Sequence, residues 1–177
     1  MSTRDIVFIA LFAAITAAAG LFPPFPLPVT GVPITVQSIG PMLAGSILGA
    51  RRGFLSQLLF LALVAVGLPL LSGGRGGIAV FAGPTAGYLA GWACGALVIG
   101  ILVDRFGSEL TLVKAVIFNI LGGILVVYVF GIAWTLILLK LNPVTALISS
   151  LPFIPGDLIK VAIASFVAVS VRRTYKV

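Results

Sequence analysis

The segment PTAGYLAGWACGALVIGILVDR (residues 84–105) carries no charged side chain until its last two residues, Asp104 and Arg105. A helix needs about 20 mostly apolar residues to cross the hydrocarbon core of a membrane. This segment meets the requirement without interruption by charge. It is therefore predicted to form a membrane-spanning helix that ends at the charged pair.

The composition of the whole chain extends this prediction. Of the 177 residues, 60% are hydrophobic and 8% are charged, whereas a soluble domain carries about 25% charged residues. Such a chain has too few polar side chains to cover a surface in water, so it is predicted to be an integral membrane protein. It has no histidine, the commonest general base and metal ligand. One cysteine, Cys94, allows no internal disulfide, and no metal or cofactor is expected.

Apolar runs separated by stretches rich in glycine and proline predict an all-α membrane fold with six transmembrane helices. The first run, with three alanines at 17–19, imitates a signal peptide, but the spans that follow indicate a retained helix. Residues 134–151 are apolar but interrupted by Asn142 and Pro143, and are expected to form a partly embedded connection. The predicted spans, in a single transmembrane domain covering residues 1–177, are 5–21, 37–50, 52–71, 84–105, 112–130 and 155–171.

Basic residues are distributed unevenly between the two ends of these helices. Cytoplasmic loops of membrane proteins carry an excess of lysine and arginine. With a cytoplasmic N-terminus, Arg75 and Lys140 fall outside, and Lys160 lies near the outer end of the last helix. The basic residues that then fall on the cytoplasmic side are Arg4, Arg51, Arg52, Arg105, Lys114, Arg172, Arg173 and Lys176. Both termini are expected to be cytoplasmic, and the net charge of +7 reflects topology rather than nucleic-acid binding.

One acidic residue lies apart from the basic side. Asp157, in PFIPGDLIK (152–160), is expected in the first turn of a helix that begins at Pro155, and Lys160 follows on nearly the same helical face. Charged groups at membrane depth are costly and usually face a protein interior or a cavity. The other acidic residues, expected to be solvated on the cytoplasmic side, are Asp5, Asp104 and Glu109.

The pair of Asp157 and Lys160 has two interpretations. In the structural one, Asp157 complements the dipole at the helix N-terminus and pairs with Lys160. In the functional one, the carboxylate accepts N–H groups and the ammonium donates to a carbonyl, which suits a neutral urea or amide ligand.

Residues of the outer loops offer further walls for such a pocket. Arg75, in SGGRGG (72–77), can neutralise a carboxylate tail, although a solvated loop charge or a lipid contact fits it equally. GVPITVQS (31–38) can form a lid. Tyr88 and Trp92, four residues apart on one predicted helix, can line an apolar slot, with helix packing the more ordinary role for Trp92.

Two further features are expected outside the pocket. Ala10, Ala14 and Ala18 repeat at four-residue spacing, a pattern that permits close approach of another helix, usually within the same chain. Tyr128 and Trp134 are expected near the outer membrane interface, where aromatic side chains form belts.

Four stretches of the sequence, in order, carry a resemblance to a known family. They are GVPITVQSIGPMLAGSILGARRG (31–53), GLPLLSGGRGGIAVFAGPTAGYLAG (67–91), YVFGIAW (128–134) and LPFIPGDLIK (151–160). The more specific blocks among them are GPTAGY and PFIPGDLIK. Together they resemble the BioY family, the biotin-specific substrate-binding (S) components of energy-coupling factor (ECF) transporters.

The resemblance implies a six-helix S-component fold with biotin bound near the extracellular face. It implies that Asp157 and Lys160 hold the ureido ring, and that the valerate tail lies near two candidates, Arg75 and Tyr88. By the same resemblance, the surface that meets a transmembrane coupling protein contains Ala10, Ala14 and Ala18.

The predicted function is a biotin-binding subunit in the bacterial cell (inner) membrane. It captures extracellular biotin and delivers it to the cytoplasm with the coupling protein and two ATP-binding subunits, since the sequence holds no phosphate-loop motif of its own. One alternative is an S component for another vitamin, and another is a stand-alone secondary transporter with Asp157 and Lys160 as a proton-coupled pair. An enzyme is not expected, because no nucleophile–base pair is evident.

Overall fold

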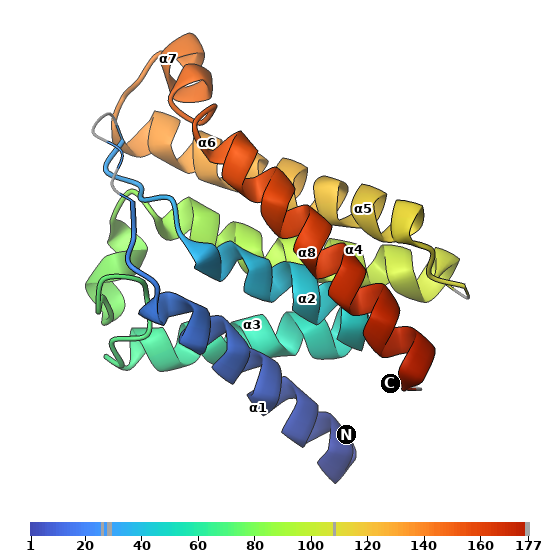
Figure 1. The fold of residues 1–177 in the computed structure, drawn as a ribbon. Helices are drawn as coiled ribbons and strands as arrows, with labels where there is room; N and C mark the ends of the chain where they lie inside the picture. The colour runs from blue at the N-terminus through green and yellow to red at the C-terminus, as the bar shows by residue number, and fades with distance from the viewer. Residues whose placement is uncertain (26, 28–29, 108, 176–177) are drawn as a thin grey trace.

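The computed structural model describes residues 1–25, 27, 30–107 and 109–175; the predicted cytoplasmic residue Lys176 lies outside them. Its helices form a bundle (Figure 1). They are α1 Thr3–Ala18, α2 Ile39–Leu48, α3 Ala50–Ala65, α4 Ala86–Phe106, α5 Leu112–Asn119, α6 Val127–Leu138, α7 Pro143–Ile148 and α8 Phe153–Thr174. A π-helical turn, η4 Ile120–Val126, joins α5 directly to α6. Short 3₁₀ turns lie at η1 Ala19–Leu21, η2 Val36–Ser38 and η3 Ile78–Ala82.

This architecture confirms the predicted all-α membrane fold. Four segments are long and apolar enough to cross a membrane, namely 3–21, 86–106, 112–138 and 153–174. Because α5, η4 and α6 form one continuous span, they count as a single predicted helix. Together with the shorter α2 and α3, these segments correspond to the six predicted spans.

The predicted boundaries of the third span are wrong at both ends because of glycine geometry. The prediction was 52–71, but α3 begins at Ala50 and ends at Ala65. Gly49, with a positive φ of 79°, turns the chain directly from α2 into α3. Gly67, with a φ of 109°, lies just beyond the end of α3. Both φ values lie in a region that glycine enters without steric cost.

The fifth span is longer than predicted. It was expected to end at residue 130, but α6 continues to Leu138. The connection predicted for 134–151 is therefore helical in its first part. After α6 the short helix α7 begins, where the Asn142 side chain accepts a hydrogen bond of 2.7 Å from the Thr145 amide. This is the usual role of asparagine before a helix.

Helix α4 owes its central place in the bundle to a row of glycines. Gly87, Gly91 and Gly95 repeat at four-residue spacing on the face that meets α6 and η4. A Cβ at Gly91 would lie 2.9 Å from the Val127 Cα, and a Cβ at Gly87 would clash with Trp134. Small residues at this spacing allow helix backbones in membranes to approach closely.

Buried polar side chains join helices α2, α5 and α8 to one another. The Asn119 carbonyl oxygen accepts a hydrogen bond of 3.0 Å from Ser46, and its amide donates one of 3.0 Å to Ser165. All three residues are fully buried. Because lipid offers no hydrogen-bond partner, this cluster satisfies its polar groups within the protein and fixes α2, α5 and α8 together.

The two ends of the bundle differ in chemistry. Both chain termini lie at one end (Figure 1), where Arg52 is 3.7 Å from Asp5 and Arg172 donates to the Ser46 carbonyl at 3.3 Å. The other end carries the loops that follow α1 and α3. The candidate site lies at this loop end.

Candidate binding site

A pocket at the loop end gathers residues from distant parts of the sequence. Its walls come from the segment before α2, the loop after α3, and helices α4, α5–α6 and α8. The four predicted ligand residues, Arg75, Tyr88, Asp157 and Lys160, all line this pocket. The predicted lid segment 31–38 also contributes to the wall, through Val32, Pro33, Thr35, Gln37 and Ser38.

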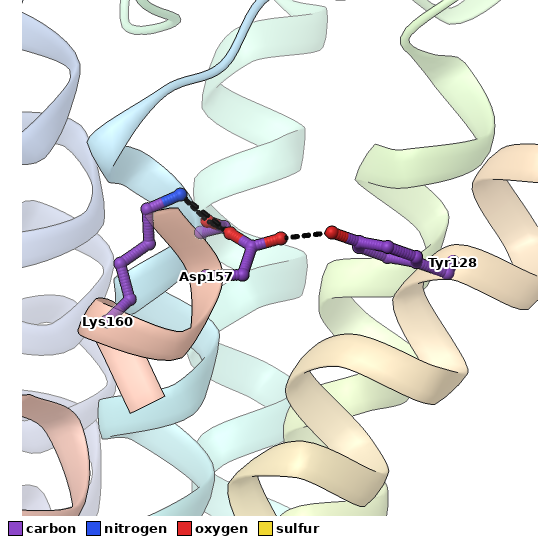
Figure 2. A network of polar contacts seen from close by, with 4 residues as sticks. Tyr128, Asp157 and Lys160 are labelled. Carbon is purple, nitrogen blue, oxygen red and sulfur yellow. Dashed lines mark hydrogen bonds and ion pairs between the residues drawn. The ribbon is translucent and has the colours of Figure 1, made fainter. Parts of the chain in front are cut away.

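Helix α8 supplies the charged pair of the pocket. It begins at Phe153, so the predicted start at Pro155 is wrong and Asp157 lies beyond the first turn. Proline is tolerated at the third helical position, because the first amides of a helix have no partner within it. Lys160 Nζ donates to Asp157 Oδ1 at 2.7 Å (Figure 2). The two side chains are only 11% and 9% exposed.

Tyr128 and Ser38 complete the polar cluster. The Tyr128 hydroxyl donates to Asp157 Oδ2 at 2.7 Å (Figure 2). Lys160 Nζ donates to Ser38 Oγ at 2.9 Å, and that hydroxyl lies 3.4 Å from Asp157 Oδ1. The placement of Tyr128 in an aromatic belt is therefore wrong, and Ser38 carried no separate signal beyond its place in the predicted lid.

The polar cluster retains hydrogen-bonding capacity toward the pocket. An ammonium has three donors, and that of Lys160 uses two of them on Asp157 and Ser38. A carboxylate has about four acceptor sites, and that of Asp157 accepts from Lys160, Tyr128 and Ser38. One donor on Lys160 and one acceptor site on Asp157 therefore remain, on two side chains that contact each other. This is the complement of a urea or amide edge, which presents an N–H beside a C=O.

Arg75 brings a positive charge to the pocket from the loop after α3. Its backbone pairs with that of Leu71, with N···O distances of 3.0 and 3.2 Å, and its Nε donates to the Ser72 carbonyl at 3.3 Å. Partial burial lowers the pKa of Arg75 from its usual value, but an arginine stays protonated at neutral pH. The loop therefore offers a permanent cation to an anionic ligand group.

Aromatic side chains form the apolar part of the wall. The Phe153 ring lies 5.8 Å from the Tyr88 ring and 6.3 Å from the Tyr128 ring. Trp92 also lines the pocket, and it packs 6.2 Å from the Phe60 ring. Trp92 therefore packs against a neighbouring helix and lines the pocket as well. The Tyr88 hydroxyl shares a hydrogen bond of 3.3 Å with Ser150.

The alanine stripe lies apart from the pocket. Ala10, Ala14 and Ala18 are all exposed on α1, whereas Ala13 on the neighbouring face is buried. Packing within the chain, the ordinary explanation of such a stripe, therefore does not use these three residues.

The described part of the structure also shows how potential metal ligands are distributed. Among the residues that the structure describes, no group of three or more histidine, cysteine, aspartate or glutamate side chains is close enough to hold a metal ion. The pocket chemistry is that of hydrogen bonds, one ion pair and aromatic surface.

Comparison with known proteins gives consistent matches over almost the whole chain. The model of the BioY family matches residues 1–177. The biotin transporter BioY of Rhizobium etli is 50% identical over 180 residues, covering 99% of this chain and 96% of the relative. The biotin transporter BioY of Rhodobacter capsulatus is 48% identical over 174 residues, covering 93% and 91%.

A solved structure shares the fold. The crystal structure of the S-component for biotin from an ECF-type ABC transporter is 32% identical to this chain and matches it with a TM-score of 0.93. The match covers 98% of this chain and 95% of that one. The relatives are named transporters rather than enzymes, in agreement with the prediction.

Proposed function

This chain belongs to the BioY family, and from that membership we propose that it is the biotin-binding S component of an ECF-type uptake transporter. Its membrane fold and its biotin-transporter relatives support a role in biotin uptake. The observation that carries the proposal is the buried pair of Asp157 and Lys160 in a pocket that also holds Arg75.

The pocket chemistry suits each part of biotin. The ureido ring presents N–H groups beside a carbonyl, and it meets the free acceptor of Asp157 and the free donor of Lys160. Burying such a polar ring is unfavourable unless its groups find partners. The apolar body of biotin lies against the aromatic wall near Tyr88. The anionic valerate tail is held by Arg75, whose planar guanidinium matches a carboxylate.

The membrane arrangement follows from charge and from the exposed face of α1. The basic residues near the chain termini favour a cytoplasmic location for that end, so the pocket faces the outside. Ala10, Ala14 and Ala18 form the surface that contacts the coupling protein, because their small side chains permit close helix approach. Two ATP-binding subunits complete the transporter, with residues 1–177 acting as one transmembrane domain.

The test of this proposal has a binding arm and an uptake arm. Protein purified in detergent is titrated with biotin, riboflavin and thiamine, and biotin is expected to bind at least 100-fold more tightly than either of the others. Uptake of labelled biotin is then measured in cells with and without coupling subunits. Tight binding of another vitamin in place of biotin would show that this vitamin is the substrate. Uptake without any coupling subunit, lost on collapse of the proton gradient, would indicate a secondary transporter.

Replacing Tyr128 by phenylalanine is expected to weaken biotin binding about tenfold. The substitution removes the hydroxyl that orients the Asp157 carboxylate, and a hydrogen bond to a charged group contributes about 1.5–3 kcal/mol. Titration of Tyr128→Phe beside wild type measures the effect. Tyr175→Phe is the matched control, since Tyr175 is 66% exposed near the C-terminus. Equal affinity in Tyr128→Phe and wild type would show that the Tyr128 hydroxyl does not contribute to biotin binding.

A further inference from the structure

The side chain of Gln37 joins three segments of the chain beside the pocket. Its Nε2 donates to the carbonyl of Thr16 at 3.0 Å, near the end of α1, and to that of Leu70 at 2.9 Å. Its Oε1 accepts from the Ser72 amide at 2.8 Å and from the Ser72 hydroxyl at 3.2 Å. Gln37 itself precedes α2 and is 1% exposed.

These contacts use the full hydrogen-bonding capacity of the amide. A glutamine side chain has two N–H donors and one carbonyl oxygen with two lone pairs. Both donors of Gln37 and both acceptor positions are occupied by the protein. Although Gln37 lines the pocket, it has no remaining group for a ligand. Its role is therefore to hold other parts of the pocket in place.

The loop that Gln37 holds carries Arg75. Gly73, Gly74 and Gly77 in this loop all have positive φ angles, and glycine-rich backbone restricts its own conformation weakly. Ser72 receives the contacts from Gln37, and its carbonyl accepts a hydrogen bond of 3.3 Å from Arg75 Nε. A continuous chain of contacts thus runs from Gln37 through Ser72 to the guanidinium.

The next residue in sequence reaches the other polar part of the pocket. Ser38 lies within hydrogen-bond distance of both Asp157 and Lys160. Residues 37 and 38 therefore connect the start of α2 to the Arg75 loop and to the charged pair at once. Because of this connection, the spacing between the two polar parts depends on Gln37.

We infer that Gln37 is a positioning residue that sets the affinity for the carboxylate tail of the ligand by holding the Arg75 loop. The inference rests on the proposed function, and in particular on biotin as the ligand. Loss of the Gln37 contacts leaves Asp157 and Lys160 in place but lets the Arg75 loop adopt other conformations. The affinity for an anionic tail falls, while the affinity for the ureido ring does not.

The experiment compares Gln37→Asn with wild type, using biotin and its methyl ester as ligands in detergent. Asparagine keeps the amide but is one methylene shorter, so it cannot reach both Thr16 and Ser72. The variant is expected to bind biotin about tenfold more weakly and the ester within about twofold of wild type. In an Arg75→Ala background, Gln37→Asn is expected to cause no further loss for biotin, because Gln37 acts on the tail through the guanidinium that this background lacks, and residues of one hydrogen-bond network are non-additive.

A matched control separates positioning from general damage. Gln57 is also a fully buried glutamine, and its Nε2 donates to the Thr16 hydroxyl at 3.2 Å. Gln57→Asn is expected to lower thermal stability without changing the ratio of biotin to ester affinity. If Gln37→Asn does not fold, Ser72→Ala replaces it. That variant loses the hydroxyl contact with Gln37, and a loss of about threefold for biotin but not for the ester is expected.

Each outcome separates this inference from the proposed function. Equal losses for biotin and ester in Gln37→Asn, or no loss for biotin, would overturn the positioning role. Equal binding of the acid and the ester by wild type would show that Arg75 does not hold the carboxylate tail. That result would overturn the inference but leave biotin as the ligand. Wild type that binds neither would remove the proposed function itself.

Discussion

Asp157→Asn is expected to weaken biotin binding by a factor of roughly 30 to 4,000. Asparagine is neutral, so the ureido N–H groups lose a charged acceptor, and hydrogen bonds to charged groups are the stronger ones. The substitution also leaves the buried ammonium of Lys160 without its counter-charge, 2.7 Å away in the wild type. Removing one partner of a buried, hydrogen-bonded charge pair costs about 2–5 kcal/mol. Each tenfold change in affinity corresponds to about 1.4 kcal/mol.

Titration calorimetry of wild type, Asp157→Asn, Lys160→Met and the double variant provides the measurement. Because the two side chains contact each other, their effects are expected to be non-additive, and the double variant should lose less than the sum of the single losses. Glu109→Gln is the matched control, because Glu109 is an exposed carboxylate near the start of α5. Equal affinities in all variants would assign the pair of Asp157 and Lys160 to a structural role.

The sequence predicts the charged pair because its spacing is local. Asp157 and Lys160 are three residues apart, and any helix through them places both on one face. The location of Arg75 at the same end follows from topology, because the third helix must end there. Periodicity does not decide between the structural and functional interpretations of these residues, because it gives no information on which side chains from distant segments converge. The structure brings Arg75, Tyr88, Asp157 and Lys160 into one pocket, and their roles toward biotin stay a prediction.

Tyr128 illustrates what the sequence could not provide. The direction of its side chain depends on η4, a π-helical turn in which each backbone hydrogen bond joins residues five apart instead of four. Such a turn shifts the helical face of every later residue relative to a regular α-helix, so a helical wheel drawn from Leu112 gives a wrong orientation at Tyr128. The glycine row in α4 is different, because Gly87, Gly91 and Gly95 are visible in the sequence as a small-residue repeat. That repeat marks the internal contact, whereas the alanine stripe of α1 is exposed.

Ala14→Trp is expected to reduce coupled biotin uptake to background while leaving biotin binding within about twofold of wild type. Ala14 is exposed in the middle of the stripe formed with Ala10 and Ala18. A helix that packs against such a stripe approaches closely because the side chains are small. An indole at the centre is expected to separate the two surfaces of the proposed contact and so to prevent docking of the coupling protein. The pocket is unaffected, since none of the three alanines lines it.

Two control variants separate loss of docking from loss of folding. Ala162→Trp places the same indole on an exposed position of α8, where uptake is expected to continue. Ala14→Ser keeps a small side chain and is expected to retain uptake. Radiolabelled biotin uptake in cells that contain the coupling subunits gives the transport rate, and titration of the purified variants gives the affinity. Normal uptake by Ala14→Trp would show that the coupling protein contacts another face, and loss of binding would show that the indole disturbs the bundle itself.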